Sequence, residues 1–220
     1  MDRFRSGRLA GLVTFFMAIA LCVPNSGCVS ALATGMWLLN GNNVKAEFKD
    51  LKGKRVAVVC RPPASLGFSH ANTAPDLAKQ IGLLLKEKVS KIEVVSQQDV
   101  ANWNDENTWD DFAEIGQALK ADLVVGVDLE DFTLYQGQTL YQGKANVRIR
   151  VYDLKNSGSV VYDKIPPRFI YPPNTGIPTS EKQESEFRRQ YIAILAEEIA
   201  QNFYDYDPNN GFARDSTSLD

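Results

Sequence analysis

The chain has 220 residues, of which 44% are hydrophobic and 23% charged, with 15 glycines and 10 prolines. This composition is typical of a globular protein and excludes a collagen-like, coiled-coil or wholly disordered chain. The formal net charge of −3 argues against a nucleic-acid binder that neutralises phosphates. Three cysteines and one histidine exclude a disulfide scaffold and a multi-histidine metal site. We expect no cofactor and no metal.

The start of the chain is typical of a secretory signal peptide, predicted over residues 1–27. Three arginines precede the apolar run LAGLVTFFMAIALCV at residues 9–23, which is shorter than a typical membrane span. Small residues then stand directly before Cys28, as in a bacterial lipobox, where the cysteine thiol takes a diacylglycerol and becomes the new amino terminus. Asn25 stands where that motif usually has leucine. This pattern predicts lipidation at Cys28.

Two other outcomes stay open for this segment. Residues 31–33 (Ala-Leu-Ala) form an A-x-A site, and cleavage after Ala33 would release a secreted soluble domain. An uncleaved anchor is the third interpretation. Cleavage before Cys28 removes three arginines and one aspartate, so the net charge of −3 becomes −5. We expect a lipoprotein held on a membrane through its lipid and facing the periplasm.

Residues 28–53 are predicted to be a tether, 54–206 a domain and 207–220 a disordered tail. The domain opens with the strand RVAVVC at 55–60, whose unbroken apolar run predicts burial on both faces and a buried Cys60. A helix follows over 73–88, then a short strand at 92–95. We expect a short helical turn at 97–103 and a helix beginning after Asp111.

The second half predicts a β-meander and a long helix. A strand is predicted at 121–135. Its apolar residues change from odd-numbered to even-numbered positions near 128–131, which indicates a bulge. A return strand covers 144–152, and a third antiparallel strand begins at 160. The proline-rich segment 165–178 excludes a helix or a central strand, and a helix follows it.

The predicted order is β-α-β-α-β-β-β-α, in which the early strands are parallel and the last three antiparallel. The predicted fold class is mixed α/β (α+β): a single, three-layer-like domain with a mixed sheet.

Several of these stretches resemble one family of envelope proteins. The resemblance rests on four stretches: the signal segment that ends before Cys28, RVAVVC at 55–60, EIGQALKADLVVGVDLEDF at 114–132 and VRIRVYD at 147–153. Together they resemble the α/β domain found in the amino-terminal domain of TolB and in CsgG, PelC and LpoB. The resemblance covers about residues 54–203. It implies an envelope assembly factor and carries over no catalytic residue.

The loop at 61–72 holds the serine–histidine pair of the chain. Ser69 and His70 are adjacent, Ser65 is close, and there is no G-x-S-x-G motif. The acidic run Asp128, Glu130 and Asp131 is interpreted as a solvated strand end rather than a cation site. We therefore expect a protein that is not an enzyme.

Two apolar segments are candidate partner surfaces. They comprise Pro62, Pro63 and Phe68 in the first loop, and Phe169, Ile170, Tyr171 and Ile177 in the proline-rich segment. The alternative for the second set is that Phe169 and Tyr171 fold back to cap the core.

We expect a non-enzymatic envelope lipoprotein, an accessory or assembly factor that docks onto a larger complex in secretion, polysaccharide export or cell-wall synthesis. One alternative is a small-ligand binding module or hydrolase that uses the 61–72 loop, and another is the secreted domain cleaved after Ala33. The sequence leaves a homo-oligomer open.

Overall fold

The computed structural model describes residues 43–63 and 72–208. Within this part of the chain the strands are β1 (Arg55–Arg61), β2 (Glu93–Val94), β3 (Leu123–Gln136), β4 (Leu140–Asp153), β5 (Ser159–Lys164), β6 (Phe169–Tyr171) and β7 (Ile177–Pro178). The α-helices are α3 (Thr73–Lys88), α4 (Gln97–Glu106), α5 (Phe112–Ala118) and α6 (Glu184–Ala200).

The strands form one mixed sheet, as predicted. Its order is β2-β1-β3-β4-β5, and β6 and β7 also pair with β4. The strand β1 pairs in parallel with β2 and β3, whereas β4 is antiparallel to β3, β5, β6 and β7. The prediction of a mixed α/β fold in a single domain is therefore confirmed.

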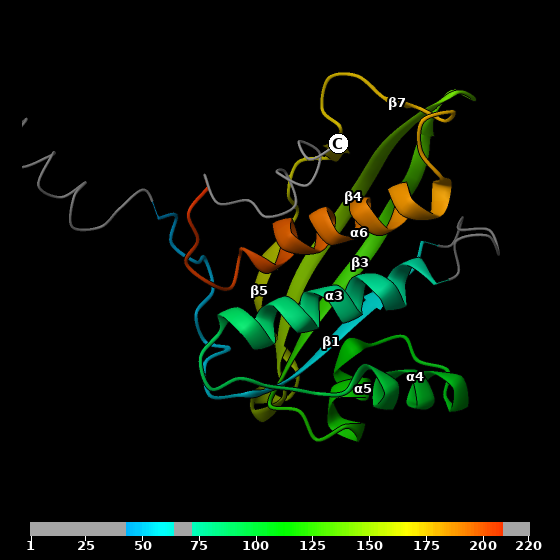
Figure 1. The fold of residues 1–220 in the computed structure, drawn as a ribbon. Coiled ribbons are helices and arrows are strands. Elements are labelled where there is room, and N and C mark those ends of the chain that lie inside the picture. The colour runs from blue at the N-terminus through cyan, green and yellow to red at the C-terminus, as the bar shows by residue number, and fades with distance from the viewer. Residues whose placement is uncertain (1–42, 64–71, 209–220) are drawn as a thin grey trace, which may run out of the picture. The chain divides into compact units, whose positions relative to one another are not determined.

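Helices cover the two faces of the sheet and define two cores. The helices α3 and α6 lie side by side across one face (Figure 1). Val56 and Val58 of β1 pack into their core, while Ala57 and Val59 pack into a smaller core with α4 and α5. Because successive strand side chains point to opposite faces, the unbroken apolar run of β1 serves both cores.

The predicted bulge in β3 is present. The pairing of β3 with β4 shifts register between Leu129 and Asp131. Before the shift Leu129 faces the larger core, and after it Phe132 and Leu134 do. The extra residue re-aims the strand, so both halves of β3 pack under α6.

The domain begins earlier than predicted, because residues 44–53 belong to it and not to the tether. Val44 bridges to Tyr206, and Phe48 and Leu51 are buried in the larger core. The backbone N–H groups of Glu47 and Phe48 both donate to the Asn202 carbonyl, each at 3.0 Å. We call residues 44–53 the N-terminal strap. The apolar residues of the strap are spaced among lysines, so the sequence pattern does not reveal that the strap is buried.

Asn202 also joins the strap to β5 through its side chain. Lys164 Nζ donates to Asn202 Oδ1 at 2.7 Å and pairs with Glu47 Oε1 at 2.5 Å. The hydrogen bond from Lys164 holds the pKa of the Glu47 carboxyl below its ordinary value. The strap is therefore fixed by polar contacts as well as by burial.

The segment predicted as a short helical turn over 97–103 is the complete helix α4, which ends at Glu106. Ser96 caps it, since its Oγ accepts from the Gln98 N–H at 3.2 Å. Val100 is its single buried residue. That weak apolar pattern is the reason the sequence understates its length.

The proline-rich segment contains neither a helix nor a central strand, in agreement with the sequence. It contributes β6 and β7, which have three and two residues and pair only with β4. The signal peptide, Cys28, Ala33 and Phe68 lie outside the described residues, as does the predicted tail from 209 onward. No helix in the described part is long and apolar enough to span a membrane.

Candidate functional site

A groove lies at the edge of the sheet where β2 stops. β2 pairs only with Arg55 and Val56, so among the described residues no strand covers the second half of β1 on that side. α3 forms one wall of the groove and α4 the other, on opposite faces of the sheet, and the space between them is about 490 Å³. We call it the α3–α4 groove.

The open edge of β1 is partly covered by a side chain instead of a strand. The Val95 N–H donates to the Val56 carbonyl at 2.9 Å, and then the Gln97 Nε2 donates to the Val58 carbonyl at 3.0 Å. The peptide groups of a strand face the same edge at every second residue. The peptide groups of Cys60 therefore face the groove, past the point where β2 ends.

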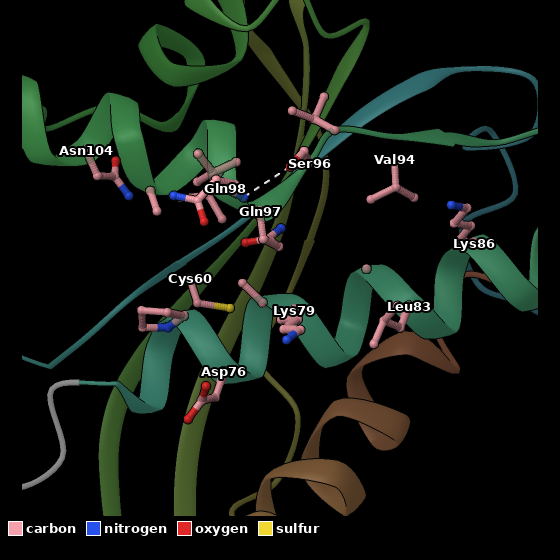
Figure 2. A pocket seen from close by; sticks show the side chains of 17 residues that line it. Cys60, Asp76, Lys79, Leu83, Lys86, Val94, Ser96, Gln97, Gln98 and Asn104 are labelled. Atoms are coloured by element: carbon pink, nitrogen blue, oxygen red, sulfur yellow. Dashed lines mark hydrogen bonds between the residues drawn. The ribbon is translucent and has the colours of Figure 1, made fainter.

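The α3 wall presents an apolar side chain between two cations. Lys79, Leu83 and Lys86 all line the groove along α3 (Figure 2). The Leu83 side chain is 53% exposed. Among the described residues, neither lysine has an ion-pair or hydrogen-bond partner. This wall therefore combines positive charge with an exposed apolar side chain.

The α4 wall is lined by amide side chains. Gln97, Gln98 and Asn104 contribute to it (Figure 2). The Asn104 Oδ1 is buried, and no group in the described part of the chain donates a hydrogen bond to it. A buried acceptor without a donor costs about 1–3 kcal/mol, and a bound N–H group would recover that cost.

Cys60 is buried, as its apolar strand predicts, and lines the floor of the groove. Burial raises the pKa of its thiol far above the ordinary value, and the negative charge of Asp128 adds to the effect. Because the thiolate is the nucleophilic form, this cysteine is inert at neutral pH.

Of the first predicted partner segment the structure describes Pro62 and Pro63, and these two residues lie away from the second segment. Pro62 and Pro63 follow the carboxyl end of β1, while β6 and β7 pair with β4. The strand β3 and then β4 stand between them in the sheet. Pro62 and Pro63 are therefore separated from β6 and β7 by two strands of the sheet.

Most of the second predicted segment packs inward. Phe169 stacks on Tyr191 with ring centroids 5.9 Å apart, and Tyr171 and Ile177 also pack against the larger core. Ile170 points outward and is 37% exposed. This arrangement matches the alternative in which the aromatic residues cap the core.

The acidic run of β3 is engaged by arginines. Asp128 pairs with Arg61 and Arg150, and Asp131 pairs with Arg168. In the described residues there is no group of three or more acidic, histidine or cysteine side chains that could hold a metal ion. Ser65, Ser69 and His70 lie outside the described residues.

Sequence reasoning missed the α3–α4 groove. Leu83 is the signal that could have found it, because it lies off the buried stripe of Leu77, Ile81 and Leu85 and is flanked by two lysines. A large apolar residue on the polar side of an amphipathic helix is a marker of a contact surface.

No family model matches the chain, and no curated protein matches it. Solved structures with a similar fold include a PelC dodecamer from Paraburkholderia phytofirmans, at 11% identity over 73% of this chain and 94% of that chain, with a TM-score of 0.42. The lipoprotein GNA1162 from Neisseria meningitidis is similar at 13% identity over 66% of this chain and 97% of that one, with a TM-score of 0.41. A minor lipoprotein from Acinetobacter baumannii is 15% identical over 68% of this chain and 91% of that one, with a TM-score of 0.34. At such identities the likeness concerns the fold alone. The sequence resemblance to TolB, CsgG and LpoB stays a prediction.

Proposed function

We propose that the protein is a non-enzymatic lipoprotein of the cell envelope, an accessory or assembly factor that docks onto a larger envelope complex through the α3–α4 groove. The observation that supports docking is the α3 wall, where exposed Leu83 stands between the unpaired Lys79 and Lys86. An exposed apolar residue next to an open strand edge is a surface that partners cover.

Membrane attachment supplies the other half of this function. The signal segment ends at Cys28, and the described domain begins after Asn43. A diacylglycerol on Cys28 would hold the domain at the periplasmic side of a membrane, and the residues between would let it reach a partner.

Substituting Cys28→Ser is expected to abolish acylation completely, because the lipid is attached through that thiol. Intact-mass analysis of the mature protein should show a chain that begins at residue 28 and carries lipid, and the variant should lack this lipid. The domain should keep its thermal unfolding midpoint, because it begins well after position 28. A wild-type chain that begins at Thr34 without lipid would leave only the secreted alternative.

A photo-crosslinking amino acid in place of Leu83 is expected to trap the partner in intact membranes. Leu83 is more than half exposed, so the substitution should leave folding unchanged. The matched control carries the same group in place of Ile165, which is 65% exposed near the opposite edge of the sheet. A defined crosslinked protein from position 83 and not from 165 supports docking in the groove.

Two other outcomes would replace this proposal. A product of twice the chain's mass would identify a second copy as the partner, which is the homo-oligomer that the sequence leaves open. Equal products from positions 83 and 165, or none, would remove the groove as the docking site.

The size of the groove favours a second candidate, the small-ligand binding module. Its volume of about 490 Å³ falls within the range of small-molecule sites, and its amide side chains could orient a polar ligand. A thermal-shift screen of small metabolites against the wild type and an Ala101→Trp variant tests this candidate. A stabilising compound that the variant no longer binds would favour it over protein docking.

A further inference from the structure

We infer that the α3–α4 groove takes an extended, acidic peptide segment of the partner, an inference that rests on the proposed docking function. The charge of the groove, the backbone groups that it offers and the spacing of its cations support this ligand.

The groove is positive although the chain as a whole is negative. The formal net charge of the chain is −3, yet the charged residues that line the groove are Lys79, Lys86 and Asp76. Asp76 is already paired with Arg188 at 2.8 Å. The two lysines are therefore free to attract carboxylates, and the net negative charge of the chain disfavours an acidic segment elsewhere.

The groove also offers acceptors that need N–H donors. The Asn104 Oδ1 is buried without a donor, and the peptide groups of Cys60 face the same space by the two-residue repeat of β1. The backbone N–H groups inside a helix are already bonded within that helix, whereas those of an extended chain are free. An extended segment satisfies these groups and a helical one does not.

The spacing of the lysines sets the pattern of the ligand. Lys79 and Lys86 are seven residues apart on α3, which is about 10 Å along a helix axis. Three residues of an extended chain span the same distance, at about 3.3 Å each. Because only alternate residues of an extended chain share a face, the complementary segment has two acidic residues four positions apart, about 13 Å, with an apolar residue midway between them to meet Leu83.

The test uses fluorescent, acetylated decapeptides and the mature full-length protein in detergent. One set carries two glutamates two, three or four positions apart around a leucine, in an alanine–serine background. A matched set has glutamine, and a third has lysine, in place of each glutamate. Fluorescence anisotropy should show binding by the glutamate set, weaker binding by the glutamine set and none by the lysine set.

Reversing both lysines, with Lys79→Glu and Lys86→Glu, is expected to weaken binding of the acidic peptide by about tenfold or more, since two attractions become repulsions. The lysine peptides should now bind instead. The control reverses Lys52 and Lys120, which changes the net charge equally but lies outside the groove. That control should bind the acidic peptide within about twofold of the wild type. Equal losses in the two double variants would reduce the effect to net charge and overturn the inference.

Backbone recognition has its own readout. Methylating the peptide nitrogens around the central leucine removes the N–H donors and should weaken binding, and Asn104→Leu, which removes one of the two acceptors, should make that loss smaller. Equal affinity of methylated and unmethylated peptides for the wild type would contradict the extended mode.

The inference and the proposed function can fail separately. If the crosslink from position 83 persists in the charge-reversed protein, docking in the groove stands and the acidic segment is wrong. If no crosslink forms from position 83, docking in the groove itself fails.

Discussion

Substituting Gly143→Ala is expected to lower the free energy of unfolding by about 3 kcal/mol, which is the upper part of the usual cost of overpacking a core. Gly143 lies in β4 directly beneath Tyr191 of α6. A Cβ at this position would lie 2.4 Å from the Tyr191 Cδ2 atom. Real Cβ atoms essentially never approach another heavy atom so closely, so either the ring or the strand must move.

The Tyr191 ring has little freedom to move. It is fully buried and lies parallel to Phe187, with ring centroids 6.2 Å apart and 2° between the planes. Phe132 and Phe169 pack beside it with centroids at 5.6 and 5.9 Å. Its hydroxyl donates to the Phe169 carbonyl at 3.3 Å. Any displacement would disturb these three aromatic contacts and one hydrogen bond together.

Urea unfolding of the purified domain measures the effect. The control is Gly137→Ala in the β3–β4 turn, where the added Cβ meets open space and only the left-handed backbone (φ +69°) is strained. That strain costs about 1–2 kcal/mol. Combining Gly143→Ala with Tyr191→Leu should cost less than the sum of the two changes, because the smaller side chain makes room. A cost for Gly143→Ala no larger than that of Gly137→Ala would show that α6 yields easily.

The sequence predicts this fold well where local patterns and tertiary packing agree. The apolar run of β1 indicates burial on both faces, and the parity shift of β3 locates its bulge. The apolar stripe of α6, from Phe187 through Tyr191 to Ile199, marks the face that covers the sheet. These features are local, so one stretch of sequence is enough to reveal each.

The outcome for the predicted partner surface depends on tertiary contacts that local sequence patterns do not reveal. Phe169 and Tyr171 are two residues apart, so a strand places both on one face and Ile170 on the other. The prolines conceal such a short strand, and only the position of Tyr191 decides which face is buried. The α3–α4 groove is likewise missed, because it depends on where β2 stops pairing with β1. Both features belong to contacts between distant segments.

A half-buried ion cluster supplies the second large effect. The Asp128 carboxylate faces two arginines: Arg150 donates to its Oδ2, and the Nη1 of Arg61 lies 3.5 Å from its Oδ1. Both guanidinium groups also stack on rings, with the Arg61 Cζ 4.6 Å from the centre of Phe112 and the Arg150 Cζ 5.6 Å from that of Tyr152. One carboxylate thus compensates two cations that are held on an aromatic surface.

Substituting Asp128→Ala is expected to lower the free energy of unfolding by about 2–3 kcal/mol. Removing one partner from a fully buried ion pair costs about 3–5 kcal/mol. The value here is smaller because the Arg61 and Arg150 side chains are 35% and 23% exposed, so water screens part of the repulsion. Urea unfolding measures the loss, and Asp128→Asn separates the lost charge from the lost volume.

Two variations identify electrostatic repulsion as the cause of that loss. Raising sodium chloride from 0.05 to about 1 M shortens the Debye length from more than 10 Å to about 3 Å, so the deficit of Asp128→Ala should shrink. Adding Arg61→Gln removes one of the two like charges and should recover part of the lost stability, even though the same change costs stability in the wild type. A deficit that neither salt nor the second substitution alters would mean that Asp128 acts through packing, and the cluster would then be a surface contact of little energetic weight.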